Sequence, residues 1–236
     1  AWHQAQLITE DAYFYLLDAL LQGIPYVSNI TGTYGAYLKH WDKRAAKPLA
    51  LMPSALTDNH QANRALNQDA LALLPELRGD IVYIDTPYNT RQYAPNYHVL
   101  EAIARWDKQP LHGVTGQRDN TAEKSLFAMK SKAKDAMSAL FSNLKFRHVI
   151  VSYSTDGILS EAELHEILAA NAIGGQVSVV RIPYRKYKSK VVNPDTEVFE
   201  LLFYFKSQKG VAAPASKQAP ITAERPQRVG GFIKSP

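Results

Sequence analysis

The sequence has no cysteine among its 236 residues. This absence excludes a disulfide framework and a thiolate metal site, and it fits a reducing cytoplasm. No apolar run approaches the roughly 18 residues that a membrane span needs, and the N-terminus lacks the charged-then-apolar pattern of a secretion signal. No paired carboxylates, nucleophile–base pair or metal-spaced cluster stands out, which argues against a strand-loop hydrolase. We therefore expect a cytoplasmic protein with no membrane partner and no metal.

The residues that are present give a globular composition and an excess of basic charge. Hydrophobic residues make up 46% of the chain, charged residues 21%, and the net charge of +5 favours a polyanionic partner. Residues 181–190 hold five basic residues and two tyrosines without an acidic residue. Such a mixture can hold phosphates and stack an unstacked base; a solvated loop is the alternative. The candidates for nucleic-acid contact in this run are Arg185, Lys186, Tyr187 and Lys188.

Helical and strand patterns alternate along most of the chain. Thr9 predicts a capped helix over residues 9–22, and Ser160 with Glu163 predicts a capping box at the start of a helix over 161–170. Further helices are expected over 70–74, 96–106 and 121–144, and strands over 80–84, 147–153, 176–182 and 198–205. This alternation predicts a doubly wound α/β sheet. The tail, residues 207–236, is rich in Pro, Ala, Gly, Gln and Lys, and we expect it to be disordered.

The most informative motif is Asp85-Thr86-Pro87-Tyr88, which follows the apolar strand predicted over residues 80–84. We expect this strand to be buried and parallel, and the carboxyl ends of such strands are where ligands bind in open α/β sheets. A carboxylate and a backbone carbonyl can accept the two N–H bonds of an exocyclic amino group, and an aromatic ring can stack on the base that carries it. A plain turn is the alternative, because Asp and Pro are common turn residues.

The sequence around the motif resembles a known family. Asn89-Thr90-Arg91-Gln92-Tyr93 and Asn96-Tyr97-His98 follow it, and further similar stretches lie at residues 29–37, 67–70 and 151–157. Together they cover roughly residues 25–206 and resemble the adenine-specific DNA methyltransferases of bacterial restriction–modification systems. Because the family binds S-adenosylmethionine and double-stranded DNA, we expect both here, along with a partner restriction endonuclease. The implied fold is a Rossmann-like methyltransferase sheet, mostly parallel, with a C-terminal antiparallel hairpin and a small target-recognition insert.

The resemblance also assigns roles to the residues of the motif. Asp85 and the carbonyl of Thr86 would orient the amino group of a flipped adenine, Pro87 would hold the turn, and Tyr88 would stack on the base. Asp69 matches the acidic residue that recognises the adenine of the cofactor, and Asp85 would also contribute to the cofactor site. Equally, Asp69 can cap the short helix that follows it.

Further residues are expected to contact DNA or to line the base pocket. The resemblance places a target-recognition segment at residues 24–60, between an N-terminal helix over 1–23 and a catalytic core over 61–206; a basic loop packed on the core is the alternative. His98 is expected to be structural or solvent-facing. The remaining candidates for nucleic-acid contact are Lys39, Arg44, Arg91, Tyr93, Tyr153 and Ser154, the last two as walls of the base pocket.

Two departures from the family pattern bear on activity. Thr86 stands where the family usually has proline, so the carbonyl is kept but the fixed φ of proline is lost. We expect this to reduce turnover without abolishing it. Nothing between Ala1 and Asp85 matches the family's Phe-x-Gly-x-Gly-like cofactor loop, so the chain looks like a member that begins after its first cofactor motifs. A cytosine- or RNA-directed amino-methyltransferase and a non-catalytic DNA-binding remnant therefore stay open as alternatives.

Overall fold

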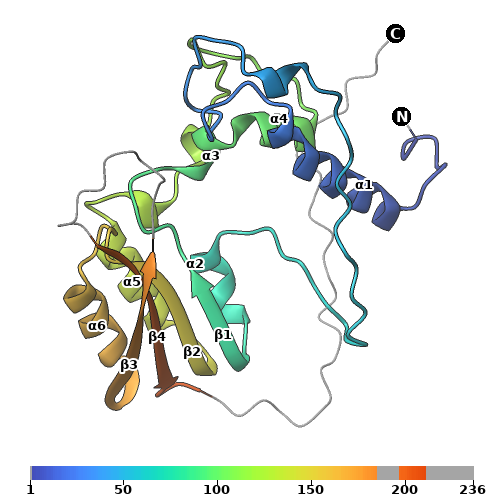
Figure 1. The fold of residues 1–236 in the computed structure, drawn as a ribbon. Helices are drawn as coiled ribbons and strands as arrows, with labels where there is room; N and C mark the ends of the chain where they lie inside the picture. The colour runs from blue at the N-terminus through green and yellow to red at the C-terminus, as the bar shows by residue number, and fades with distance from the viewer. Residues whose placement is uncertain (1, 185–196, 211–236) are drawn as a thin grey trace.

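The computed structural model describes residues 2–184 and 197–210 and contains a single four-stranded sheet in this part of the chain (Figure 1). The order of the strands across the sheet is β1-β2-β4-β3. Their bounds are Gly79–Asp85 for β1, Phe146–Ser154 for β2, Ala172–Tyr184 for β3 and Val198–Ser207 for β4. All four predicted strands are confirmed; β1, β2 and β4 are slightly longer than expected and β3 is considerably longer, and the fold is a mixed α/β fold.

The strand directions differ in part from the prediction. β1 and β2 are parallel, with Asp85 opposite Ser152, while β2–β4 and β3–β4 are antiparallel. The expected antiparallel hairpin of β3 and β4 is confirmed, but a mostly parallel sheet is not found in the described residues. β3 carries a register shift between Ala172 and Val177, where Gly174 and Gly175 have φ of 61° and 69°. Glycine adopts this left-handed backbone without a steric cost.

One face of the sheet is covered by two helices, α5 (Ala133–Ser142) and α6 (Glu161–Ala169) (Figure 1). The capping box predicted for α6 is present, since Ser160 accepts from the Glu163 N–H and the Glu163 carboxylate accepts from the Ser160 N–H. The core beneath these helices includes Met137, Phe141, Val149, Leu164, Leu168, Phe203 and Phe205, none more than 1% exposed. Alternate residues of β2 and β4 supply its floor, as the period-two geometry of strands requires.

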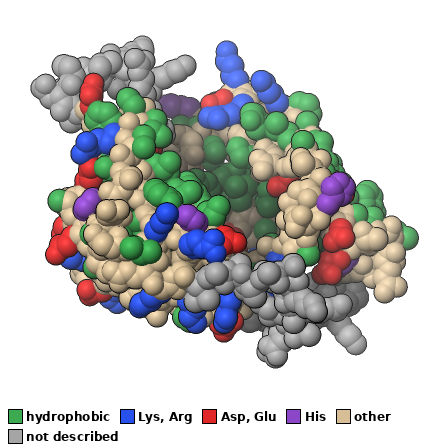
Figure 2. Space-filling view, turned by 90° about the horizontal axis from the view of Figure 1, so that it is seen from below, with side chains coloured by type: hydrophobic (Ala, Val, Ile, Leu, Met, Phe, Trp, Pro, Cys, Tyr) green, Lys and Arg blue, Asp and Glu red, His purple; other side chains and the backbone are tan. Residues whose placement is uncertain are grey.

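The other face of the sheet stays open in the described part of the chain. Ile81 and Tyr83 on β1 are 64% and 59% exposed, and Val180, Ile182 and Tyr204 on the neighbouring strands are also exposed. The expectation that β1 is buried is therefore wrong for this structure, because β1 is the edge strand and only its Val82–Ile84 face meets the core. Figure 2 shows that the molecule is hollowed when seen from below, with hydrophobic side chains inside the hollow.

A second, smaller core lies away from the sheet. It joins α1 (Glu10–Gly23), which Thr9 caps as predicted, to α4 (His98–Arg105) through Ile24, Ile30 and Tyr34 (Figure 1). The short helices η1 (Ile24–Tyr26) and η2 (Lys43–Ala46) follow α1 in the chain, and α3 (Tyr93–Asn96) precedes α4. A Cβ on Gly23 would lie 2.2 Å from the carbonyl oxygen of Ala50, so glycine lets the strand-like segment around residue 50 approach α1.

Three predicted boundaries differ from the structure. The helix expected over 121–144 is divided into the 3-10 turns η4 (Thr121–Glu123) and η5 (Leu126–Ala128) and the helix α5. The helix expected over 96–106 is broken at Tyr97 into α3 and α4. The tail begins later than residue 207, since Ser207 ends β4 and the N–H of Gln208 donates to Asn171; residues 211–236 lie outside the described residues.

Among the described residues, no helix is long and apolar enough to cross a membrane.

Candidate functional site

Asp85 is the last residue of β1, at the carboxyl end of the parallel strand pair. Its side chain lies on the open face of the sheet, with Ile81 and Tyr83, because side chains two residues apart share a face. Asp85 is exposed, and its carboxylate makes no hydrogen bond or ion pair with any residue that the structure describes. The sheet thus presents a carboxylate whose oxygen atoms are available to a ligand.

Thr86 turns the chain away from the sheet. Its side chain is buried, 7% exposed, and its hydroxyl lies 3.9 Å from the sulfur of Met137 on α5. Within residues 2–184 and 197–210, no donor forms a hydrogen bond with the Thr86 carbonyl. The threonine side chain thus anchors the turn in the core where a proline ring would have restricted φ, and the carbonyl remains an available acceptor beside Asp85.

Tyr88 is fixed by the loop that follows β2. Its carbonyl accepts a hydrogen bond from the Ile158 N–H at 2.7 Å and a weaker one from the Tyr153 hydroxyl at 3.4 Å. The rings of Tyr88 and Tyr153 meet edge to face, with centroids 6.1 Å apart. The Tyr153 hydroxyl also accepts from the Leu159 N–H at 3.1 Å. Two segments about seventy residues apart in the sequence are thereby joined behind the motif.

The expected pocket residues Tyr153 and Ser154 take a supporting position. They are 1% and 2% exposed, and burial raises the pKa of the Tyr153 hydroxyl. A side chain without accessible surface cannot contact DNA in this conformation. Tyr153 therefore forms the wall behind Tyr88, and the DNA contact predicted for Tyr153 and Ser154 stays a prediction.

The segment after the motif carries two of the expected DNA contacts, Arg91 and Tyr93, both exposed. The side chain of Gln92 between them exchanges two hydrogen bonds with the backbone of Ser125, at 3.1 and 2.8 Å. Burial, and then the negative charge of Asp85, raise the pKa of the Tyr93 hydroxyl. Tyr93 thus lies close enough to Asp85 for the charge of Asp85 to act on its hydroxyl, and its contact with DNA stays a prediction.

Asp69 caps a helix, as one of its two predicted roles requires. Its Oδ1 accepts from the N–H groups of Leu71 and Ala72, at 2.9 and 3.1 Å, at the start of α2 (Ala70–Leu73). The second carboxylate oxygen, Oδ2, makes no hydrogen bond with a described residue, and the side chain is exposed. Asp69 can therefore cap the helix with Oδ1 and still contact a cofactor with Oδ2.

Residues 24–60 are mainly irregular, and their two candidate cations differ. Lys39 is exposed. Arg44 is half-buried; its Nη2 donates to the Ile30 carbonyl at 2.8 Å and pairs with Asp42 at 3.2 Å, so it mainly stabilises its own segment. The remaining candidates, Arg185, Lys186, Tyr187 and Lys188, lie outside the described residues.

His98 ties this segment to the helix after the motif. It is 2% exposed, and its Nε2 donates to the Tyr34 carbonyl at 3.1 Å, while the Tyr34 N–H donates to the Asn96 carbonyl at 3.0 Å. The structural role expected for His98 is confirmed. The consequence is that the residues around Tyr34 are held against α4, the helix that follows the motif in the chain.

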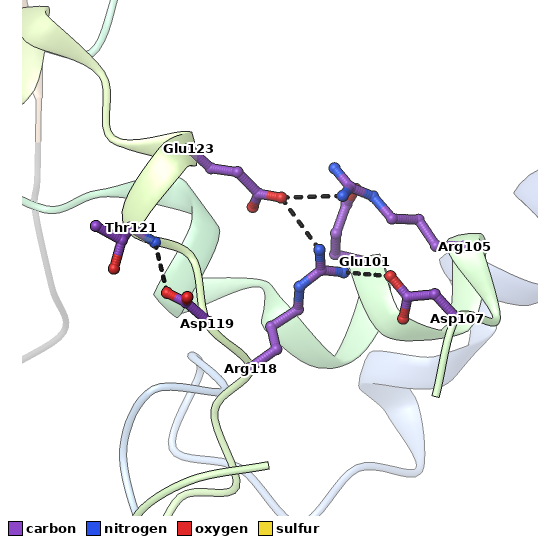
Figure 3. A network of polar contacts seen from close by, with 7 residues as sticks. All are labelled: Glu101, Arg105, Asp107, Arg118, Asp119, Thr121 and Glu123. Carbon is purple, nitrogen blue, oxygen red and sulfur yellow. Dashed lines mark hydrogen bonds and ion pairs between the residues drawn. The ribbon is translucent and has the colours of Figure 1, made fainter. Parts of the chain in front are cut away.

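A polar network fixes the loop that follows α4 (Figure 3). Arg118, 4% exposed, lies between the carboxylates of Asp107 and Glu123, at 3.4 and 3.1 Å. Arg105 also pairs with Glu123 at 3.0 Å and with Glu101 one helical turn before it. The loop also lines a pocket of about 420 Å³ against α4, with Trp106, Leu111 and Ile103 among its walls. Since Arg118 links both ends of this loop, its role is structural.

Glu200 on β4 is a site residue that the sequence analysis missed. Ser154 lies opposite it in the sheet, so Glu200 shares the open face and the carboxyl edge with Asp85. It is half-buried, and no described residue forms a hydrogen bond or an ion pair with its carboxylate. Burial, and then the charge of Asp85, raise the pKa of Glu200. The signal was an acidic residue within the apolar run Val198–Phe205, which is unusual unless the carboxylate has a function.

Comparison with known proteins agrees with this arrangement. The modification methylase StsI of Streptococcus sanguinis is 44% identical over 236 residues, which are 100% of this chain and 36% of that protein. The type II methyltransferase M.FokI of Planomicrobium okeanokoites is 42% identical over the same shares. M.NlaIII of Neisseria lactamica is 37% identical over 191 residues, or 80% of this chain and 55% of that protein.

The chain thus spans about a third of the length of the first two relatives. No solved structure matches it significantly. A family model described as D12 class N6 adenine-specific DNA methyltransferase matches residues 3–167, which include the motif, Asp69 and the loop that holds Tyr88. The chain belongs to the D12 class of N6 adenine-specific DNA methyltransferases.

Proposed function

We propose that this chain carries the catalytic centre of an S-adenosylmethionine-dependent methyltransferase that modifies the amino group of adenine in double-stranded DNA. The observation that carries the proposal is the pair of available acceptors at the end of β1, the Asp85 carboxylate and the Thr86 carbonyl. An amino group has two N–H bonds, and two acceptors hold both. Modification methylases of restriction–modification systems are among the relatives, and a partner endonuclease is part of the proposal.

The target adenine must leave the base stack to reach these acceptors, because its amino group is otherwise within the duplex. The ring of Tyr88 then stacks on the base, and the hydrogen bonds from Ile158 and Tyr153 fix the backbone that carries this ring. Hydrogen bonds from the amino group to Asp85 and Thr86 shift the nitrogen lone pair out of the ring. Alignment of this nitrogen with the methyl donor supplies most of the acceleration.

The methyl donor would be held by two carboxylates, those of Asp69 and Asp85. S-adenosylmethionine supplies an activated methyl group when bound, and its amino groups need acceptors. The free Oδ2 of Asp69 and the exposed carboxylate of Asp85 offer such acceptors. Asp69 would hold the adenine amino group of the cofactor while Oδ1 keeps its capping bonds.

DNA contacts and domains follow the same proposal. Tyr93 lies near enough to Asp85 for the charge of Asp85 to raise its pKa, and Arg91 and Tyr93 would contact the strand that carries the target base. Residues 24–60, with Lys39, would read the target sequence, residues 61–206 would form a Rossmann-like catalytic core, and residues 1–23 would support it. The hydrogen bond between His98 and Tyr34 supports this division, because it connects residues 24–60 to α4, the helix that follows the motif in the chain.

The direct test is an Asp85→Ala variant of the full-length protein, assayed by transfer of a radioactive methyl group to unmethylated DNA. We expect the single-turnover rate to fall at least about 100-fold, the effect of removing one preorganised hydrogen-bonding group in a site. Asp80→Asn is the matched control, because Asp80 lies on the same strand and pairs at the surface with Arg147 at 3.4 Å. Equal activity of Asp85→Ala and wild type would overturn the proposal.

A further inference from the structure

Glu200 holds a position that the proposed reaction leaves without a role. β1 and β4 flank β2, and the register places Asp85 opposite Ser152 and Glu200 opposite Ser154. The four side chains therefore share the open face, and β1 and β4 are about 10 Å apart across β2. Both carboxylates are at the same edge of the sheet, with two serines between them.

The backbone around Glu200 is fixed on the side of β2. The Thr155 N–H donates to the Phe199 carbonyl, and the Phe199 N–H donates to the Thr155 hydroxyl, both at 3.0 Å. Ser154, which pairs with Glu200, is 2% exposed. A half-buried carboxylate at a fixed position without a partner in the described residues is costly unless it has a use.

The methylation reaction has a proton that needs an acceptor. When the amino nitrogen forms its bond to the methyl carbon, the bond from this carbon to sulfur breaks and its electron pair stays on the sulfur. The nitrogen then carries a positive charge and two hydrogens, and one proton must leave to give the neutral product. Asp85 holds one of these hydrogens, but a carboxylate that keeps the proton cannot serve the next turnover.

We propose that Glu200 receives this proton from Asp85 through bridging water and releases it to solvent. The inference rests on the proposed function and adds a positioning residue that acts through Asp85. Negative charge on Asp85 makes Glu200 a better base, and the pKa of Glu200 is raised by burial and by that charge. Half-exposure gives Glu200 the contact with solvent that release of the proton requires.

The groups that face Glu200 favour this direction of transfer. β1 contributes Asp85, β2 contributes the non-ionisable Ser152 and Ser154, and β3 contributes Ile182 opposite Glu200. The cation nearest in register, Arg181 on β3, belongs to the other face and pairs with Glu161 at 2.7 Å. Among the described residues, therefore, no cation pairs with Glu200, so no ion pair lowers the affinity of its carboxylate for a proton.

The test is the pH dependence of steady-state methyl transfer, over many turnovers, by the full-length protein on excess unmethylated DNA. In the wild type, the rate should fall as the pH drops through the raised pKa of Glu200, because only the carboxylate accepts a proton. Glu200→Gln should be about 100-fold slower at neutral pH, which is the lower end of what a positioned proton acceptor contributes. Its rate should also no longer show the fall at low pH, the acidic limb of the pH profile, that the wild type shows. Glu200→Asp should keep the limb at an intermediate rate. Glu197→Gln, an exposed neighbour, is the matched control.

A second measurement is independent of activity. The carboxyl carbon of Glu200, observed by NMR with labelled glutamate, should titrate at a lower pH in Asp85→Asn than in the wild type. A Glu200→Gln variant with the wild-type rate and the wild-type acidic limb would overturn the inference, as would an unchanged titration in Asp85→Asn. If Asp85→Ala abolishes transfer and Glu200→Gln does not slow it, the inference alone fails; if Asp85→Ala transfers normally, the proposed function fails.

Discussion

The two faces of the sheet differ in cover and in chemistry. On the covered face, Val149, Phe203 and Leu164 are completely buried under α5 and α6, and the residues there are almost all apolar. On the open face, the exposed side chains of Ile81 and Tyr83 share the surface with the carboxylates of Asp85 and Glu200. In this sheet the residues of the core and the residues of the candidate site lie on opposite faces, because successive residues of a strand point to opposite faces.

The largest effect on stability is expected on the covered face. Phe203→Ala removes a ring that is 0% exposed and packs in the main core, which should lower the free energy of unfolding by about 3–5 kcal/mol. Urea unfolding followed by circular dichroism measures this change. A loss below about 1 kcal/mol would mean that the core closes around the missing ring, against the close packing expected of protein interiors.

A smaller effect is expected at the N-terminal end of α6. Ser160→Ala removes the capping hydroxyl and should cost about 1 kcal/mol. The partner Glu163 adds a pH dependence, because hydrogen bonds from the N–H and the hydroxyl of Ser160 lower the pKa of its carboxyl group. A lowered carboxyl pKa stabilises the fold above the unfolded pKa, and this stabilisation is lost as the pH falls through the folded pKa. Unfolding of Glu163→Gln at a series of pH values should therefore differ from wild type at neutral pH and converge with it in acid.

The smallest effect is expected on the open face. Tyr83→Ala removes a ring that is 59% exposed, so the free energy of unfolding of residues 1–236 should change by less than about 0.5 kcal/mol. The same urea titration measures it beside Phe203→Ala. A loss as large as that of Phe203→Ala would contradict the difference between the two faces described above.

Local patterns in the sequence identified most elements of the fold. The Thr9 and Ser160 caps, the hairpin strands and the motif strand were predictable because each depends on neighbouring residues. The helix over 121–144 was not predictable in this way, since a contact far along the chain, between Gln92 and Ser125, fixes the extended backbone there. The edge position of β1 depends on strand order, which periodicity does not report.

The centre of the candidate site can be predicted from a local pattern, and its border cannot. Asp85, Thr86 and Tyr88 form a contiguous motif, so their spacing in the sequence is also their spacing in space. Tyr153 was placed correctly beside the motif, but its burial depends on how the loop after β2 folds back. Glu200 reaches the site only through the register of β4 against β2, and no local pattern carries that information.

The hydrogen bond from Ile158 to the Tyr88 carbonyl limits which substitutions the motif and the loop after β2 can accept. Gly157, next to Ile158, has no room for a side chain, because a Cβ there would lie 2.3 Å from the ring of Tyr153. Any larger residue at this position would displace that ring and, with it, the backbone of Tyr88. Tyr88, Tyr153 and the glycine are therefore expected to vary together or not at all, and a compensating substitution for a damaged motif is best sought in the loop after β2.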